Sequence, residues 1–273
     1  MKRDGNMDNV CEIGCFILDL DGTVYLGNEV IAGAIDFLKT LEESKRDFIF
    51  LTNNSSSSKS YYKDKLKRFG YDVDEDKIFT SGEATTIYLN SIKPKCKVFL
   101  LGTPYLEVEF IKAGFKVCKK YEKDISFVVV GFDTTLTYNK LWIACDLIRE
   151  GVGYIATHPD INCPLEGGKY KPDAGAIINF IYSSTGRKPY IIGKPNPEII
   201  KSICKKYNFK REDMAMVGDR LYTDIQTGVN SNINSILVLS GETTIEDYNS
   251  STVKADFVYK SLKELNYDLR GGI

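Results

Sequence analysis

Two aspartates separated by one residue, Asp19 and Asp21, stand at the end of an apolar run in the stretch FILDLDGTVYLG, residues 16–27. The apolar run at 16–18 predicts a buried strand, and charge at the end of a buried strand is costly unless a cation shares it. A DxDG sequence on its own is also a common turn. Whether these two carboxylates do chemistry therefore depends on what the other strand ends carry.

Reactive side chains also end three further apolar runs. They are Thr52 and Asn53 in the run at 48–54, Lys194 in the run at 190–194, and Asp219 in the run at 214–219, with Asp224 shortly beyond. In an open parallel sheet, ligands bind outside the carboxyl ends of the strands, because the loops there converge on one crevice. We therefore expect these side chains to share one site with Asp19 and Asp21.

The clustering of carboxylates predicts a magnesium site. Several carboxylates in one crevice repel each other unless a cation is present, and hard oxygen ligands with no His or Cys nearby favour Mg²⁺. In proteins, Mg²⁺ typically binds through one or two carboxylates together with substrate phosphate, which points to phosphoryl chemistry. Thr52 and Lys194 supply a hydroxyl and an ammonium suited to holding phosphate oxygens.

The elements that position these residues alternate between strands and helices. Apolar residues recur at helical spacing over 31–41, a second helix is expected from about Ser58 to Gly70, and a third starts at Pro197. Further apolar runs of strand length lie at 78–82 and 235–241. Strands that alternate with helices predict a parallel sheet covered on both faces.

The middle of the chain predicts a second α/β domain. Three more strands are expected at 97–104, 127–133 and 154–160, with helical segments such as 106–115 and 139–151 after them. The chemical residues lie in the first 60 residues and the last 80. We therefore assign residues 1–81 and 189–273 to a core domain and residues 82–188 to an inserted domain.

Composition excludes several function classes. The 36 Lys and Arg nearly balance the 37 Asp and Glu, so a formal net charge of −1 gives no basic field for nucleic acid or an anionic membrane. No apolar run approaches the ~18 residues of a membrane span. The seven cysteines form no CxxC pair, which argues against a disulfide framework or a structural zinc site. We therefore expect a cytoplasmic protein that acts on a small molecule.

Four motifs together resemble those of the haloacid dehalogenase (HAD) superfamily of phosphohydrolases. They are DLDGT at 19–23, LTNN at 51–54, GKPNP at 193–197 and GDRLYTDI at 218–225, in family order and spread over essentially the whole chain. The resemblance implies an α/β fold, with a doubly wound parallel-sheet (Rossmann-like) core and an inserted α/β cap domain.

The position of the insertion, between the second and third motifs, is similar to one subgroup of this superfamily. That subgroup contains p-nitrophenyl phosphatases and the nucleotide, phosphoglycolate and pyridoxal phosphate phosphatases, and has a large C2-type cap. The stretches GFDTTLTY, IATHPD and PDAGAI resemble its cap segments. The chain departs from the subgroup pattern at His158, where Asn or Asp is more usual, and at Asp173, where a second glycine is more usual.

The resemblance implies a catalytic role for four residues. Asp19 is the nucleophile, which attacks phosphorus and forms an aspartyl phosphate. Asp21 protonates the leaving oxygen and then deprotonates the water that attacks the intermediate. Thr52 binds phosphoryl oxygens together with the backbone amide of Asn53, and Lys194 neutralises charge on the phosphate and on Asp19.

The resemblance also implies how Mg²⁺ is held. Its ligands are Asp19, the main-chain carbonyl of Asp21, and Asp219. Asp224 is either a ligand through water or a residue that orients the others. Structural interpretations stay open beside these. Asn53 could cap the next helix, Lys194 could be a solvated cation of a loop, and Asp224 could sit favourably in a first helical turn.

Three cap residues, Asp133, His158 and Asp160, are expected to face the crevice and contact the substrate. A lone histidine before a proline is also typical of a structural or exposed position. A large cap that excludes bulk water favours a small phosphorylated metabolite as substrate. A homodimer through the cap is the assembly that the subgroup suggests.

Other functions compete with that of a Mg²⁺-dependent phosphatase acting on small phosphate monoesters. A hydrolytic dehalogenase needs neither the acid Asp21 nor a metal ligand at Asp219. A noncatalytic phosphometabolite-binding module would be expected to have lost Asp19 or Asp21. A phosphotransferase or phosphomutase would use the same centre and stays open. An EF-hand is excluded, because the stretch continues GTVYLGN without the alternating oxygen ligands that its loop requires.

Overall fold

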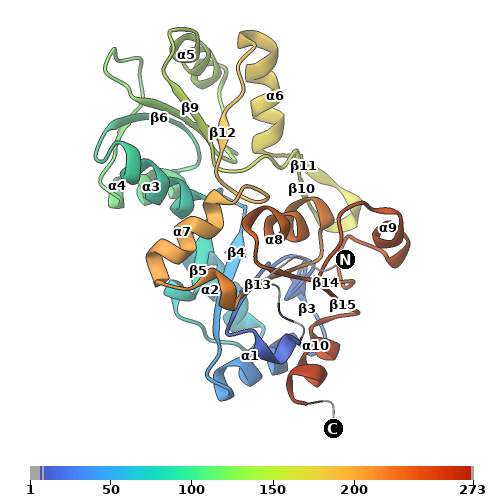
Figure 1. Ribbon diagram of the computed structural model, residues 1–273. Helices are drawn as coiled ribbons and strands as arrows, with labels where there is room; N and C mark the ends of the chain where they lie inside the picture. The colour runs from blue at the N-terminus through green and yellow to red at the C-terminus, as the bar shows by residue number, and fades with distance from the viewer. Residues whose placement is uncertain (1–6, 8, 272–273) are drawn as a thin grey trace. The chain divides into compact units, whose positions relative to one another are not determined.

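A computed structural model describes residues 7 and 9–271 of the chain. These residues form two compact units (Figure 1). Unit 1 takes in the chain up to Thr52, Tyr62–Phe79 and the chain from Lys194, and unit 2 comprises Asn53–Tyr61 and Thr80–Gly193. The predicted core domain, residues 1–81 and 189–273, also takes in residues 53–61, 80–81 and 189–193. The structure groups them with unit 2, where Asn53 and Ser55 form hydrogen bonds.

Unit 1 is built on a six-stranded sheet with β1 near its centre. The order is β15 (Phe257–Tyr259), β14 (Asn234–Val238), β13 (Met214–Gly218), β1 (Cys15–Leu18), β4 (Asp47–Thr52) and β5 (Ile78–Thr80). β1 pairs in parallel with both β13 and β4, and β14 pairs in parallel with β13 and β15. A short hairpin of β2 (Tyr25–Leu26) and β3 (Glu29–Val30) follows β1.

Helices cover both faces of this sheet. One face packs its apolar side chains, among them Phe16 and Phe50, against helices α1 (Ala34–Glu43), α2 (Lys59–Arg68) and α10 (Leu262–Leu269). Successive strand residues point to opposite faces, and Met214 on the other face contacts Cys204 of α7 (Glu198–Tyr207). The remaining helices of unit 1 are a π-helix at Leu221–Ile225, α8 (Gln226–Ser231), α9 (Ile245–Ser250) and 3₁₀ turns at Val10–Glu12, Glu75–Lys77 and Arg211–Asp213.

Unit 2 has its own parallel sheet. Its order is β12 (Tyr190–Ile191), β9 (Gly153–Ala156), β8 (Phe127–Val130), β6 (Lys97–Leu101) and β7 (Lys116–Cys118). Helices α5 (Tyr138–Arg149) and α6 (Ala174–Thr185) pack on one face, while α3 (Ser81–Ile92) and α4 (Pro104–Lys112) pack against each other. An antiparallel pair, β10 (Asn162–Pro164) and β11 (Tyr170–Pro172), flanks a 3₁₀ turn at Glu166–Gly168. The predicted α/β fold with parallel sheets is confirmed.

Two predicted element boundaries were wrong for identifiable reasons. The helix predicted over 31–41 begins only at Ala34, because Gly33 has a φ of 84°, which lies outside the helical region. The strand predicted over 78–82 ends at Thr80, whose hydroxyl caps α3 by accepting a hydrogen bond from the Glu83 backbone N–H at 2.9 Å.

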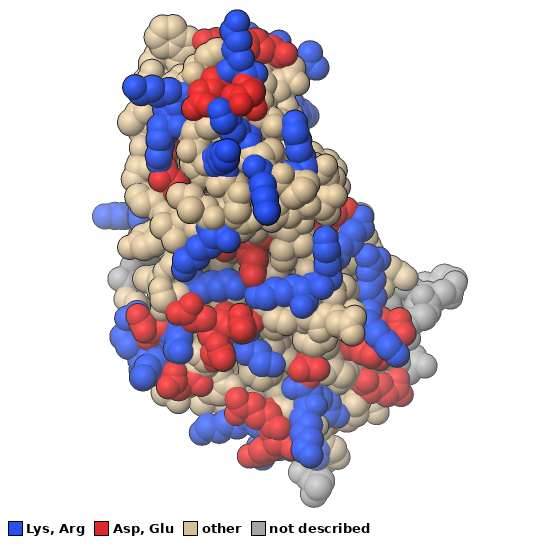
Figure 2. Space-filling view, turned by 90° about the vertical axis from the view of Figure 1, so that its left-hand side faces the viewer, with Lys and Arg blue, Asp and Glu red and all other residues tan. Residues whose placement is uncertain are grey.

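Charged side chains of both signs lie interspersed on the face shown in Figure 2. In unit 2, Lys97 Nζ lies 2.5 Å from Glu122 and 2.9 Å from Asp124. Among the helices formed by residues 7 and 9–271, none combines the length and the apolar character that crossing a membrane requires. Positive and negative side chains are thus mixed on this face, and their numbers nearly balance over the whole sequence.

Candidate active site

Three neighbouring strands of unit 1 carry Asp19, Thr52 and Asp219 at their carboxyl ends. β1 lies between β4 and β13 and runs parallel to both. Thr52 is the last residue of β4, whereas Asp19 and Asp219 each follow directly on the end of their strand. Because parallel strands end at the same edge of the sheet, the structure brings these three predicted residues together.

Asp19, Asp219 and Asp224 form an acidic cluster, in which one carboxylate oxygen of each residue lies within 4.8 Å of the others. Asp224 belongs to the π-helix that follows β13. Lys194 enters the same cluster, with Nζ 2.5 Å from Asp19 Oδ1 and 2.6 Å from Asp224 Oδ1. The Lys194 side chain is 4% exposed, so little water competes for these charge-assisted hydrogen bonds.

The acidic cluster holds more negative charge than Lys194 neutralises, and the pKa values show it. Burial raises the pKa of Asp19 to about 8; Lys194 opposes this increase, and the other two carboxylates add to it. Burial and the Asp224 carboxylate raise the pKa of Asp219 to about 7. Burial lowers the pKa of Lys194, but its attraction to Asp19 and Asp224 outweighs burial and holds that pKa above its usual range. A further cation would therefore stabilise the cluster.

Gly22 explains why a glycine follows the two aspartates. Its φ is 84°, in the left-handed region, and a Cβ at this position would lie 2.3 Å from Asp219 Oδ2. The Gly22 carbonyl accepts a hydrogen bond from Ser240 Oγ at 2.8 Å. This bond ties the turn to the loop that follows β14. Only glycine lets the backbone of this turn approach the Asp219 carboxylate so closely.

The acidic cluster fits a hard divalent cation. Asp219 Oδ2 accepts a hydrogen bond from the Glu242 backbone N–H at 2.6 Å, whereas Asp219 Oδ1 is buried and has no hydrogen-bond partner among the described residues. Both oxygens of Asp224 are engaged, one by Lys194 and one by the Arg220 backbone N–H at 3.1 Å. A buried carboxylate oxygen without a partner is costly. Oxygen-only donors suit Mg²⁺.

Asp21 lies apart from the acidic cluster. Its carboxylate is 4.0 Å from Lys65 Nζ and accepts a hydrogen bond from the Tyr25 hydroxyl at 3.4 Å. The surrounding protein raises the pKa of Asp21 and Lys65 lowers it, but the side chain is 56% exposed, so solvent limits the net change. Its predicted contribution to the metal is the main-chain carbonyl, which leaves this carboxyl available for proton transfer.

Comparison with known proteins decides the family. A family model described as haloacid dehalogenase-like hydrolase matches residues 16–116, and one described as HAD-hydrolase-like matches residues 191–265. An acid sugar phosphatase from Staphylococcus epidermidis is 34% identical over 247 residues, which cover 90% of this chain and 94% of that protein. The chain belongs to the haloacid dehalogenase-like hydrolases.

Solved structures of hydrolases agree with this assignment. A 4-nitrophenylphosphatase from Thermotoga maritima has 49% sequence identity and a TM-score of 0.90, over 95% of this chain and 98% of that one. A glycerol phosphate phosphatase from Mycobacterium tuberculosis, solved in complex with magnesium, has 27% identity and a TM-score of 0.86, over 95% of this chain and 78% of that one. The predicted family, fold and phosphatase class are confirmed.

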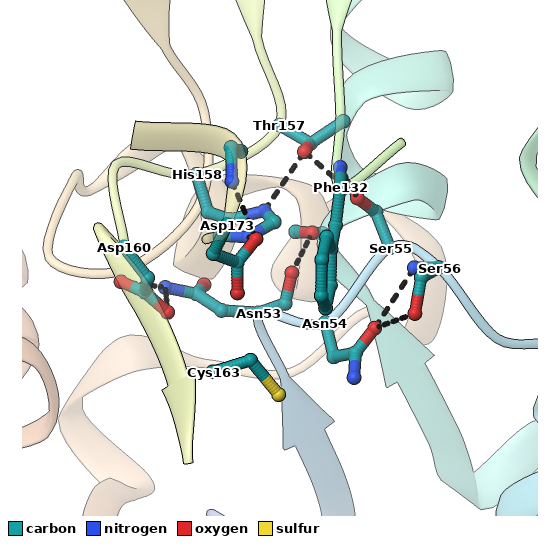
Figure 3. Close-up of polar contacts among 12 residues, drawn as sticks. Asn53, Asn54, Ser55, Ser56, Phe132, Thr157, His158, Asp160, Cys163 and Asp173 are labelled. Carbon is teal, nitrogen blue, oxygen red and sulfur yellow. Dashed lines mark hydrogen bonds and ion pairs between the residues drawn. The ribbon is translucent and has the colours of Figure 1, made fainter. Parts of the chain in front are cut away.

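In unit 2 of this hydrolase, two predicted substrate residues bind each other (Figure 3). Asn53 Nδ2 donates to both carboxylate oxygens of Asp160 at 3.2 Å. The Asn53 carbonyl accepts a hydrogen bond from Ser81 Oγ at 2.5 Å. The side chain of Asn53 is thus held from within unit 2, and its predicted phosphate contact, which uses the backbone amide, stays a prediction.

His158 lies in a buried chain of hydrogen bonds (Figure 3). The Phe132 backbone N–H donates to Ser55 Oγ, which lies 3.1 Å from Thr157 Oγ1. Thr157 Oγ1 in turn lies 2.8 Å from His158 Nδ1, and His158 Nε2 lies 2.8 Å from Asp173 Oδ1. Both ring nitrogens of His158 are thus occupied inside unit 2, which leaves neither for the substrate contact that we expected.

Asp133 is engaged in the same way. Its Oδ1 accepts hydrogen bonds from the backbone N–H and the hydroxyl of Thr135 at 2.8 and 2.7 Å, and its Oδ2 pairs with Lys140 Nζ at 2.7 Å. The side chain is fully buried. These bonds favour a structural role for Asp133 in shaping the start of α5 over the predicted contact with substrate.

Two basic residues near the acids were missed from the sequence. Arg220 follows Asp219 directly, and its Nε lies 2.9 Å from Glu242 Oε2. Lys65 approaches Asp21 from α2. A signal for Lys65 was present, because it falls three residues after Tyr62 and so lies on the apolar face of the helix, together with Tyr62 and Leu66.

Proposed function

We propose that this phosphatase hydrolyses small phosphate monoesters, such as sugar phosphates and p-nitrophenyl phosphate, with Mg²⁺ and through an aspartyl-phosphate intermediate. The observation that carries the proposal is the buried acidic cluster with Lys194 bonded into it at the carboxyl edge of the sheet. The substrate class is supported by relatives that are named as an acid sugar phosphatase and a 4-nitrophenylphosphatase.

Asp19 is proposed to attack phosphorus. Its Oδ1 accepts a hydrogen bond from Lys194, while Oδ2 has no hydrogen bond to any described residue and is the atom available for attack. A bond forms between Asp19 Oδ2 and phosphorus, and the bond from phosphorus to the leaving oxygen breaks. The electron pair goes to the leaving oxygen, which takes a proton from the Asp21 carboxyl.

The second step returns the enzyme to its starting state. Asp21, now ionised, removes a proton from water, and the water oxygen attacks phosphorus. The bond between phosphorus and Asp19 breaks, so inorganic phosphate leaves and Asp19 is again a carboxylate. Asp21 regains its proton in the same step and is ready for the next leaving group.

The remaining residues hold charge in place. Asp19, the Asp21 main-chain carbonyl and Asp219 would hold Mg²⁺, which when bound supplies positive charge to balance the carboxylates and the phosphate. Asp224 orients Lys194, since its oxygens are already engaged by Lys194 and by a backbone N–H. Thr52 and the Asn53 amide would donate hydrogen bonds to phosphoryl oxygens.

The test is phosphate release from p-nitrophenyl phosphate and a panel of sugar phosphates, with Mg²⁺ and with EDTA. We expect Mg²⁺-dependent turnover that Asp19→Asn lowers by roughly 10⁴-fold or more, because the nucleophile is lost. Asp36→Asn, an exposed acid on α1, is the matched control and should keep full activity.

Three results would contradict this proposal. Turnover that survives in Asp19→Asn would exclude the aspartyl phosphate, and turnover unaffected by EDTA would exclude the metal. Equal amounts of phosphate and alcohol should appear as products. Phosphate found instead on an added alcohol or a second sugar would show a phosphotransferase.

A further inference from the structure

A buried lysine beside the active site has no part in the mechanism above. The Lys65 side chain on α2 is only 10% exposed, and its Nζ lies 4.0 Å from Asp21 Oδ1. The same Nζ sits 3.6 Å from the centre of the Tyr25 ring. Burying an ammonium group is costly unless opposite charge or an aromatic face compensates for it. Lys65 has both, from two residues of the turn that carries the catalytic acid.

The fold places Lys65 at this position rather than in solvent. Tyr62, Lys65 and Leu66 are the buried residues of α2 and lie on one face of the helix, while Lys67 on the same helix is 63% exposed at its side chain. A lysine ammonium on the buried face of a helix loses most of its solvation. Its position is therefore explained by the groups it meets.

Tyr25 contacts the same carboxyl from another direction. Its hydroxyl donates to Asp21 Oδ2 at 3.4 Å, while Lys65 faces Oδ1. The Tyr25 side chain is fully buried, and its carbonyl accepts a hydrogen bond from the Gly22 backbone N–H at 2.7 Å. Tyr25 is thus fixed relative to the turn, and each oxygen of Asp21 meets a group that is itself held in place.

We propose that Lys65 and Tyr25 are positioning residues for Asp21. They hold an otherwise exposed carboxyl in the one orientation from which it can give a proton to the leaving oxygen. The inference rests on the proposed role of Asp21 as acid and base. Lys65 itself touches neither substrate nor metal in this proposal.

The proposal predicts selectivity among leaving groups. An alkyl alcohol is a poor leaving group and needs its oxygen protonated as the bond to phosphorus breaks, whereas p-nitrophenolate is stable as an anion and leaves without a proton. A misplaced Asp21 should therefore lower kcat/KM, which reports the step that expels the leaving group, for alkyl phosphates and leave it nearly unaffected for p-nitrophenyl phosphate. A general loss of folding or of metal would slow both substrates alike.

The experiment compares kcat/KM for glycerol phosphate and p-nitrophenyl phosphate in Lys65→Met, which keeps the length of the side chain but removes its charge. We expect kcat/KM for glycerol phosphate to fall by roughly 10- to 100-fold, part of the contribution of a general acid, and that for p-nitrophenyl phosphate to change by less than about threefold. Tyr25→Phe, which keeps the ring, should show the same pattern to a smaller extent. Lys65→Arg keeps the positive charge and should therefore retain part of the kcat/KM for glycerol phosphate that Lys65→Met loses. Lys67→Met is the control on the same helix and should change neither kcat/KM.

Asp21→Asn separates this inference from the proposed function. If Asp21→Asn shows a loss that is larger for glycerol phosphate but Lys65→Met and Tyr25→Phe slow both substrates equally or neither, the positioning role is wrong and the proposed function stands. If Asp21→Asn itself shows no preference between the substrates, the acid role falls and the positioning role falls with it. Should Lys65→Met fail to fold, Tyr25→Phe decides the outcome alone.

Discussion

At the scale of the residue, four aspartates of the candidate site lie in four different environments. Asp19 is bonded to Lys194, and Asp219 keeps one buried oxygen without a partner among the described residues. Asp224 has both oxygens engaged, and Asp21 is half-exposed beside Lys65. Because environment sets the proton affinity and the ligand capacity of a carboxylate, the four are suited to four different roles.

Asp219 and Asp224 should therefore respond differently to the loss of charge. We expect Asp219→Asn to abolish measurable Mg²⁺ binding, because its buried oxygen without a hydrogen-bond partner among the described residues is the atom proposed to bind the cation. Asp224→Asn should leave Mg²⁺ affinity within a few-fold and lower kcat by roughly 10- to 100-fold, because Lys194 loses its orienting partner. Calorimetric titration with Mg²⁺ and steady-state kinetics test both. Equal loss of Mg²⁺ affinity in the two variants would make Asp224 a ligand instead.

Gly22→Ala should be more damaging than its backbone conformation alone explains. The positive φ costs roughly 1 kcal/mol, and the new Cβ would also displace Asp219. Gly70→Ala is the matched control, because Gly70 has a φ of 85° and no atom within 4 Å of its Cβ position. Urea unfolding and Mg²⁺-dependent activity should show a moderate loss of stability in Gly70→Ala and loss of both properties in Gly22→Ala. Similar behaviour of the two variants would contradict the close approach to Asp219.

The residues of the site were predictable from sequence where chemistry and strand ends coincide. Asp19, Lys194 and Asp219 were found because polar residues that end apolar runs stand out. The role of Asp224 could not be chosen, since it depends on which oxygens are already bonded. Lys65 was missed because its proposed role depends on a contact with a turn some forty positions earlier in the chain, which the sequence does not show.

At the scale of the element, the two residues at which the sequence departs from the subgroup pattern contact each other. His158, after β9, and Asp173, at the start of α6, form a buried hydrogen bond of 2.8 Å between their side chains. A buried carboxylate needs a hydrogen-bond donor, and the His158 imidazole lies in position to provide one to Asp173. Sequence alone showed two unrelated exceptions, because nothing in it pairs residues on separate elements.

The two substitutions should be strongly coupled. His158→Asn alone removes the imidazole from the buried Asp173 carboxylate, which then keeps only its hydrogen bond from the Ala174 backbone N–H, and we expect the variant to lower the free energy of unfolding by roughly 1–3 kcal/mol. The double variant, His158→Asn with Asp173→Gly, should recover part of that loss, because glycine replaces an N-cap acid at a cost of only a few tenths of a kcal/mol. A double-mutant cycle by urea unfolding measures the coupling. Additive effects would show that the pair is incidental.

At the scale of the whole molecule, stability should depend on the metal. Surplus negative charge in the acidic cluster destabilises the metal-free protein, and Mg²⁺ at 100 times its Kd should add roughly 2.7 kcal/mol to the stability of the bound state. We expect calorimetry to show a higher Tm with Mg²⁺ than with EDTA. Asp219→Asn should show no such shift, and in EDTA it should melt no lower than the unaltered chain. A Mg²⁺ shift that survives in Asp219→Asn would place the metal elsewhere.

The division into two units was only partly accessible from sequence. The middle of the chain carried none of the chemical residues, which suggested an insertion. Residues 53–61 were assigned to the core because the chemical residues lie in the first 60 residues and the last 80, yet they group with unit 2, where Asn53 and Ser55 bond to Asp160 and Thr157, more than a hundred positions away. Hydrogen bonds between residues so far apart in the sequence cannot be predicted from local composition. The predicted homodimer through the cap stays a prediction, which sedimentation velocity would test.

The position of β1 between β4 and β13 also has a consequence for biosynthesis. The ribosome synthesises β4 soon after β1, but β13 begins only at Met214. One edge of Cys15–Leu18, a strand that is wholly buried in the folded protein, therefore stays unpaired until β13 has been made. At roughly 5–20 residues per second, this wait is roughly 10–40 s. During that time the nascent chain presents an apolar strand edge to other chains. A chaperone that shields the first sixty residues should therefore raise the yield of active enzyme more than one that acts after release.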